Sequence, residues 1–270
     1  MSVAAVTGIE RIARAFARAK AEGRLAVVIY LTVGYPDVAL TPLLLRAAID
    51  GGADVLELGV PFSDPLADGA TVQHASEIAL ANGVTLVTCL AEARSVVAEC
   101  DVPALLMGYT NPFERYGYER FAHDAAVAGV AGVIVPDLPA EESGAFDRAL
   151  DPAGMAHIDL YAPTTPEARL ARLVPHARGF VYCVSLTGVT GARSALGSDV
   201  PSFVGRVRAH TSLPVALGFG IGEPSHVRAL RGLVDGVVIG SAAIDVVTSA
   251  SDKPAALRAF VRGLADAGRS

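Results

Sequence analysis

Eight short apolar runs alternate along this chain with longer segments of helical periodicity, and Gly, Pro or Asp residues separate them. Uninterrupted apolar runs of this length are typical of parallel strands that are buried on both faces. A helix between consecutive strands supplies the right-handed crossover that parallel pairing requires. The pattern therefore predicts a (β/α)8 TIM barrel, with strands at residues 25–32, 55–59, 104–107, 132–135, 157–161, 180–184, 215–218 and 236–239.

The helical segments add two features to the plain barrel. An extra amphipathic helix is expected at residues 9–20, before the first strand, and the long segment between the second and third strands has room for two helices, at 71–81 and 86–99. Further helices are expected at 41–49, 118–128, 166–174, 202–210 and 225–231. The 270 residues fit one barrel, which typically takes about 250. No linker rich in Pro, Gly and Ser divides them, so we expect a single domain over 1–270.

Charge and cysteine usage narrow the class of protein. A net charge of −6 leaves no basic surface for a nucleic-acid backbone. No apolar stretch reaches the length of about 18 residues that a membrane span needs, and the first fifteen residues lack a secretory signal pattern. Cys89, Cys100 and Cys183 are odd in number and share no CxxC spacing, which is typical of reduced cysteines in a cytoplasmic protein.

One acidic residue stands inside the second apolar run. Glu57 lies between Leu56 and Leu58, and an apolar environment disfavours the ionised carboxylate, so its pKa should rise toward values useful for proton transfer at neutral pH. A structural Glu paired with a hydrogen-bond donor would give the same pattern, because charged residues are seldom buried without a partner or a task. This position alone leaves both interpretations open.

A second carboxylate follows on the adjoining loop. The strand that contains Glu57 is followed by a loop punctuated by Pro, and Asp68 lies on this loop. Asp68 precedes a Gly, which permits unusual backbone geometry. The working groups of parallel barrels lie at the C-terminal ends of strands and on the loops after them, so we expect the two carboxylates to share a pocket. Asp64, between Ser63 and Pro65, also fits a turn or a helix cap, and we interpret it as loop structure or a partner contact.

Glycines cluster after the last two predicted strands. Gly218, Gly220 and Gly222 follow the seventh strand, and Gly240 and Ser241 follow the eighth. Barrel enzymes often bind phosphate at this place through backbone N–H groups and a short helix N-terminus. Each glycine alone would fit an ordinary turn, but their coincidence after both strands predicts a phosphate site.

The segment after the sixth strand, residues 185–192, contains two glycines and two threonines. This composition fits a lid that closes over substrate, although a plain flexible loop has it too. We expect Thr190 to hydrogen-bond a loop carboxylate and Gly191 to lie near the phosphate.

Missing residue types also limit the mechanism. The only lysines, Lys20 and Lys253, lie outside the eight strands, which excludes an aldolase that forms a Schiff base at a strand end. The six histidines fall mostly on predicted helices, where they are not expected to converge as metal ligands. No Rossmann or Walker motif occurs in the required context, so no nucleotide is implied.

Taken together, these motifs resemble tryptophan synthase alpha subunits. Residues 56–69 look like the signature segment of that family, and residues 188–192, 218–220 and 240–241 follow in the same order with similar spacing. The resemblance covers essentially the entire chain. It implies a lyase, without a cofactor of its own, that cleaves indole-3-glycerol phosphate to indole and glyceraldehyde 3-phosphate by a retro-aldol reaction.

The resemblance also assigns roles to individual residues. Glu57 matches the general acid/base of the family, and Asp68 matches its second carboxylate, which stays ionised and accepts the indole N–H. Core packing explains several of the remaining positions equally well. These are the implied substrate contacts Tyr182, Thr190, Phe219, Tyr30, Leu106 and Tyr109, and the implied phosphate contacts Gly191, Gly220, Gly240 and Ser241.

A protein partner is implied by the same resemblance. The family works with a beta subunit that carries pyridoxal phosphate and receives indole through a channel, usually in an α2β2 assembly. Asp64, Pro65 and the pair Asn111-Pro112 look like contacts for that subunit. Leu186 and Thr187 depart from many relatives, which often carry a charged residue there, so coupling between the lid and the partner stays open.

Three other interpretations fit parts of the sequence. A stand-alone indole-3-glycerol phosphate lyase would have the same site. A non-catalytic barrel that regulates a partner enzyme would not need both Glu57 and Asp68. Another phosphosugar enzyme, such as an epimerase, would require a metal or other proton-transfer groups that the sequence does not place.

Overall fold

The structure is a computed structural model that describes residues 6–184, 199–218 and 220–269. The expected lid, including Leu186, Thr187, Thr190 and Gly191, lies outside the described residues, and so does Phe219.

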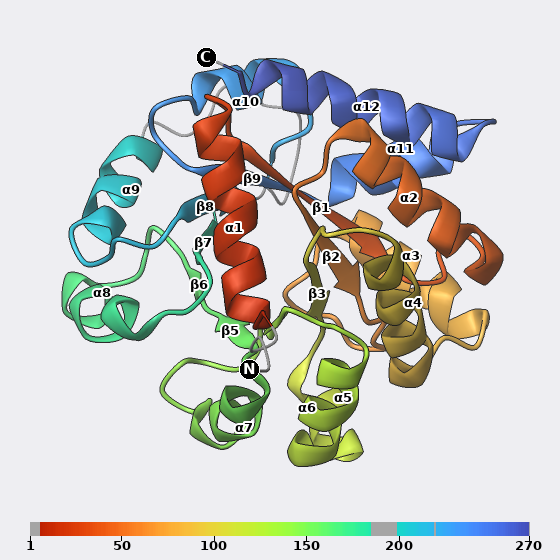
Figure 1. Cartoon of the computed structure of the whole chain (residues 1–270), viewed down its shortest axis with the longest axis horizontal. Coiled ribbons are helices and arrows are strands. Elements are labelled where there is room, and N and C mark those ends of the chain that lie inside the picture. The colour runs from red at the N-terminus through yellow and green to blue at the C-terminus, as the bar shows by residue number, and fades with distance from the viewer. Residues whose placement is uncertain (1–5, 185–198, 219, 270) are drawn as a thin grey trace, which may run out of the picture.

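The strands form one parallel sheet in the order β5-β4-β3-β2-β1-β9-β8-β7-β6. β5 and β6 stand at the two ends of this order, yet only Asp159 separates them in the chain, so the sheet closes on itself (Figure 1). The predicted (β/α)8 barrel is therefore confirmed, with its fifth strand split in two. The bounds are β1 (Ala26–Thr32), β2 (Val55–Gly59), β3 (Ala104–Met107), β4 (Gly132–Ile134), β5 (Ala156–Ile158), β6 (Leu160–Tyr161), β7 (Val181–Val184), β8 (Val215–Gly218) and β9 (Gly236–Ile239).

Helices surround the barrel (Figure 1). Both expected helices after β2 are present, as α3 and α4. The short α5 and α7, and α11 and α12 beyond β9, were not predicted; seven residues give α5 and α7 too few turns for a clear periodicity. The bounds are α1 (Gly8–Ala21), α2 (Thr41–Gly51), α3 (Ala70–Ala81), α4 (Leu86–Glu99), α5 (Thr110–Tyr116), α6 (Tyr118–Val127), α7 (Gly144–Leu150), α8 (Glu167–Leu173), α9 (Val200–Arg208), α10 (Pro224–Ala229), α11 (Ser241–Ser249) and α12 (Lys253–Ala267), with 3-10 turns η1 (Val38–Leu40), η2 (Asp151–Ala153) and η3 (Val174–His176).

Within the described ranges, no single helix has both the length and the apolar character of a membrane span. Only α3 and α4 taken together meet that test, across a bend of 101°.

The extra helix α1 closes the N-terminal end of the barrel. A capping box starts it: the Glu10 N–H donates to the Thr7 hydroxyl, and the Thr7 N–H donates to the Glu10 carboxylate. Its apolar face, which includes Ile12 and Phe16, packs into the barrel interior, where the rings of Phe16 and Phe180 lie 5.2 Å apart. The opposite, C-terminal end is left for a functional site.

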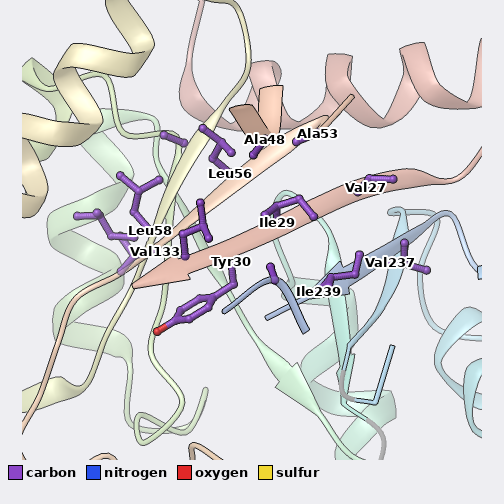
Figure 2. Close-up of a cluster of buried hydrophobic side chains, with 14 of the residues drawn as sticks. Val27, Ile29, Tyr30, Ala48, Ala53, Leu56, Leu58, Val133, Val237 and Ile239 are labelled. Atoms are coloured by element: carbon purple, nitrogen blue, oxygen red, sulfur yellow. The ribbon is translucent and has the colours of Figure 1, made fainter. Parts of the chain in front are cut away.

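The pleat of the strands sorts side chains between the barrel interior and the helix layer. Val27 and Ile29 project from one side of β1 and Tyr30 from the other (Figure 2). Residues paired in register share a face, so Tyr30, Glu57 and Leu105 all point inward. This register decides which of the expected site residues can meet.

Candidate active site

Glu57 is buried in the barrel interior near the C-terminal end of β2. Its side chain is 2% exposed, and its Oε2 atom accepts no hydrogen bond from the described residues. Asp54, which precedes the same strand, is buried too, but Arg24 binds both of its oxygens. A purely structural role for Glu57 would require a hydrogen-bond donor such as the one that Arg24 provides for Asp54. An unpartnered carboxyl oxygen instead indicates a group reserved for a ligand.

The loop after β2 brings Asp68 back to the mouth of the barrel. The loop is held by three contacts: the Ala67 N–H donates to the Tyr109 hydroxyl at 3.0 Å, the Gln73 amide donates to the Asp68 carbonyl at 2.8 Å, and the Phe62 ring stacks on that of Tyr109. The Tyr109 hydroxyl also lies near the Asp68 carboxylate and lowers its pKa. The loop carboxylate is therefore fixed in place beside the barrel interior.

The two carboxyl groups interact, but their environments differ. Burial, and then the charge of Asp68, raises the pKa of Glu57 to about 8. Burial raises the pKa of Asp68 to about 6, against a lowering by the hydrogen bond from Tyr109. The Asp68 carboxyl group is therefore less exposed to solvent than its position on a polar loop predicts. At neutral pH Glu57 is mostly protonated and Asp68 mostly ionised, which gives the pair a proton donor and a fixed negative charge.

Two tyrosines complete the interior around this pair. A Cβ atom on Gly59 would lie 2.2 Å from the Tyr30 hydroxyl, and one on Gly218 would lie 2.5 Å from the Tyr182 hydroxyl, so each ring lies directly over a glycine. The Tyr30 hydroxyl also hydrogen-bonds Thr32 at 3.1 Å. Burial and then the nearby acid charges raise the pKa of both phenols, which stay neutral.

Leu106 does not join this group, and its expected contact with the indole is wrong. It pairs in register with Leu58, whereas Leu105 pairs with Glu57, so Leu106 points outward into the helix layer. Met107, two residues after Leu105, is the β3 side chain that shares the face of Glu57 near the mouth. The strand period could have found Met107 once the register with Glu57 was known.

The glycines after β8 and β9 lie next to helix N-termini. Gly240 directly precedes α11, which begins at Ser241. Gly220, with φ +76°, stands in the turn between β8 and α10. Among the described residues, a Cβ atom added to Gly220 would have no neighbour within 4 Å. The structure thus places Gly220, Gly240 and Ser241 at the same end of the barrel as the acid pair, where backbone N–H groups can bind an anion.

Asp64 lies on the exposed part of the loop after β2 and accepts a hydrogen bond from its neighbour Ser63 at 2.5 Å. This contact agrees with its interpretation as loop structure. The adjacent Leu66 is 92% exposed.

A closed parallel barrel with two interacting carboxyl groups at its C-terminal mouth defines a barrel enzyme that works by acid–base chemistry. The model of the family described as "Tryptophan synthase alpha chain" matches residues 16–266. The chain belongs to this family.

Individual relatives cover nearly the whole chain. The tryptophan synthase alpha chain of Roseiflexus castenholzii is 52% identical over 241 residues, which are 88% of this chain and 92% of the relative. That of Chloroflexus aggregans is 46% identical over 96% of this chain and 98% of its own length. A chain in a solved structure of Mycobacterium tuberculosis tryptophan synthase superposes with a TM-score of 0.90 at 37% identity, covering 96% of this chain and 98% of that one.

These findings confirm the expected family and enzyme class. The family consists of lyases that cleave indole-3-glycerol phosphate in tryptophan biosynthesis. It uses no cofactor, since the pyridoxal phosphate of the whole synthase belongs to the beta subunit.

Proposed function

We propose that this chain cleaves indole-3-glycerol phosphate with Glu57 as the general acid/base and Asp68 as the ionised partner. The observation that carries the assignment is a pair of interacting carboxyl groups whose pKa values, about 8 and about 6, lie on either side of neutrality. A pair of this kind can hold one proton and one charge at the same time.

The retro-aldol reaction uses both the proton on Glu57 and the negative charge on Asp68. Protonated Glu57 donates its proton to C3 of the indole, and its carboxylate takes up the proton of the side-chain hydroxyl as the carbon–carbon bond breaks, so the enzyme returns to its starting state. Asp68 accepts the indole N–H and stabilises the positive charge that develops on the ring. Tyr109 orients Asp68 through its hydroxyl.

Apolar and backbone groups hold the two ends of the substrate. The rings of Tyr30, Tyr182 and Tyr109 surround the indole, and Phe219 is proposed to join them. The backbone N–H groups around Gly220, Gly240 and Ser241 bind the phosphate, because no lysine is available at the strand ends and helix N-termini favour anions. Thr190 and Gly191 retain their proposed roles in the lid.

The proposed partner is a tryptophan synthase beta subunit in an α2β2 assembly. Its docking surface includes Asp64, Pro65 and the Asn111-Pro112 turn at the start of α5. Leu66, exposed beside Pro65, adds an apolar side chain to the same surface. Structures of the whole synthase exist for Mycobacterium tuberculosis, whose alpha chain shares this fold.

We further propose that residues 1–270 form a single catalytic domain that works in the cytoplasm. One continuous sheet supports the first point. Cys89, Cys100 and Cys183 are all free, as in a reducing compartment.

Release of indole from indole-3-glycerol phosphate by the purified chain tests the function directly. The assay is run with and without a beta subunit. We expect slow turnover alone and faster turnover with the partner. Equal turnover and no binding of the partner would favour a stand-alone lyase, and no turnover under either condition would refute the proposal.

A further inference from the structure

A cavity lies on the outer side of the barrel wall, where the fifth strand splits. β5 pairs with β4 up to Ile158, and β6 pairs with β7 from Leu160, so the chain leaves β4 at Asp159. The opening holds a cavity of about 240 Å³ between this strand, the loop after β4 and α8. Tyr161 pairs with Cys183 and not with the inward-facing Tyr182, so the Tyr161 side chain points away from Glu57.

The cavity contains a buried hydroxyl without a partner. Tyr161 is 2% exposed, and its hydroxyl is shielded from solvent and makes no hydrogen bond within the described residues. A buried hydroxyl that is left unpaired costs folding free energy, so native proteins seldom keep one without a bound group.

A carboxylate stands beside that hydroxyl. Asp159 lines the same cavity, and no ion pair or hydrogen bond from a basic side chain reaches it among the residues the structure describes. Burial raises the pKa of Asp159, and burial followed by the Asp159 charge raises the pKa of the Tyr161 phenol, in agreement with their shared place on the cavity wall. The Tyr161 O–H can donate to this carboxylate, but the phenol oxygen itself accepts no hydrogen bond from the described residues.

The two basic side chains around the cavity each bind another acid. Arg169, on the rim, donates to both oxygens of Glu141 at 2.9 Å. His157, on the floor, bonds through Nδ1 to Asp147 at 2.9 Å. Within the described residues neither basic side chain donates to Asp159 or Tyr161, and the lone pairs of both groups are acceptors, so a ligand here would be a hydrogen-bond donor.

The remaining wall is apolar and restricts the size of a ligand. Val135, Leu138 and Pro139 supply it from the loop after β4. Pockets for drug-sized molecules usually exceed about 300 Å³, so the occupant is smaller than these. We infer that this cavity binds a small primary amine, whose ammonium group donates to Asp159 and Tyr161 while its short apolar body packs against the loop after β4.

Binding of 3-methylbutylamine to the full-length chain tests this inference, with 3-methylbutanol as the uncharged match. Calorimetric titration should detect the amine and not the alcohol. Asp159→Asn should weaken amine binding at least about tenfold, and Tyr161→Phe about threefold to tenfold. Asp101→Asn, which removes an exposed acid and changes the net charge equally, should leave it unchanged.

Three outcomes would overturn the inference: no amine binding, equal binding of amine and alcohol, or amine binding that persists in both cavity variants. The last outcome would place the amine elsewhere, for example at the acid pair of the barrel mouth. If Asp159→Asn does not fold, a crystal of the natural protein soaked in the amine tests whether the amine occupies this cavity. Density for the amine beside Tyr161 supports the site, and water alone refutes it.

Discussion

Replacing Glu57 by Gln should abolish cleavage and at the same time stabilise the fold in a pH-dependent way. Gln keeps the shape of the side chain but can neither carry the proton nor ionise. Loss of general acid/base catalysis should lower kcat by at least about 100-fold. The stability effect follows from the burial of Glu57 and is independent of the reaction.

The sign and size of that effect follow from the raised pKa. Glu57 has a pKa of about 8 in the fold against an ordinary 4.5, so the folded chain resists ionisation and loses stability as pH rises between these values. At 1.36 kcal/mol per pH unit, the loss reaches about 3 kcal/mol at pH 7 and about 5 kcal/mol above pH 8. Glu57→Gln removes this loss, and below pH 4.5 it should change little.

Urea unfolding of both proteins at acid, neutral and alkaline pH measures this difference. The expected result is a gap in unfolding free energy that widens with pH. Glu77→Gln, on a side chain that is 77% exposed, is the matched control and should change neither the pH dependence nor the activity. Parallel stability curves for Glu57→Gln and the natural protein would refute the buried, unpartnered state of Glu57.

Three further outcomes are expected. Lyase kcat/KM should follow a bell-shaped pH profile with limbs near 6 and 8, because Asp68 must be ionised and Glu57 protonated; a flat profile between these values would contradict the division of roles. Tyr109→Phe should lower kcat and move the acid limb to higher pH, since the lost hydrogen bond lowers the pKa of Asp68; an unmoved limb would show that Tyr109 does not act through Asp68. Gly59→Ala should destabilise the fold by about 1–3 kcal/mol and reduce activity, because the new methyl group would meet the Tyr30 ring; a thermal melt equal to that of the natural protein would contradict this packing.

Local sequence determined the strands and the acid pair. Both bounds of the expected strand coincide with the structure at β2, β3, β8 and β9, because Gly, Pro or Asp residues bound each of these apolar runs. Glu57 was identifiable because a charge in such a run is costly. Asp68 was identifiable because the loop after a strand of a parallel barrel must return to the mouth.

Only the tertiary structure decided which side chains meet. The side that Leu106 faces depends on the register of β3 with β2, and register is a relation between strands distant in sequence. The bond from Ala67 to Tyr109 and the unpaired hydroxyl of Tyr161 likewise arise from segments that come together only when the barrel closes. Sequence periodicity fixes that side chains alternate, whereas pairing between strands fixes which of them share a pocket.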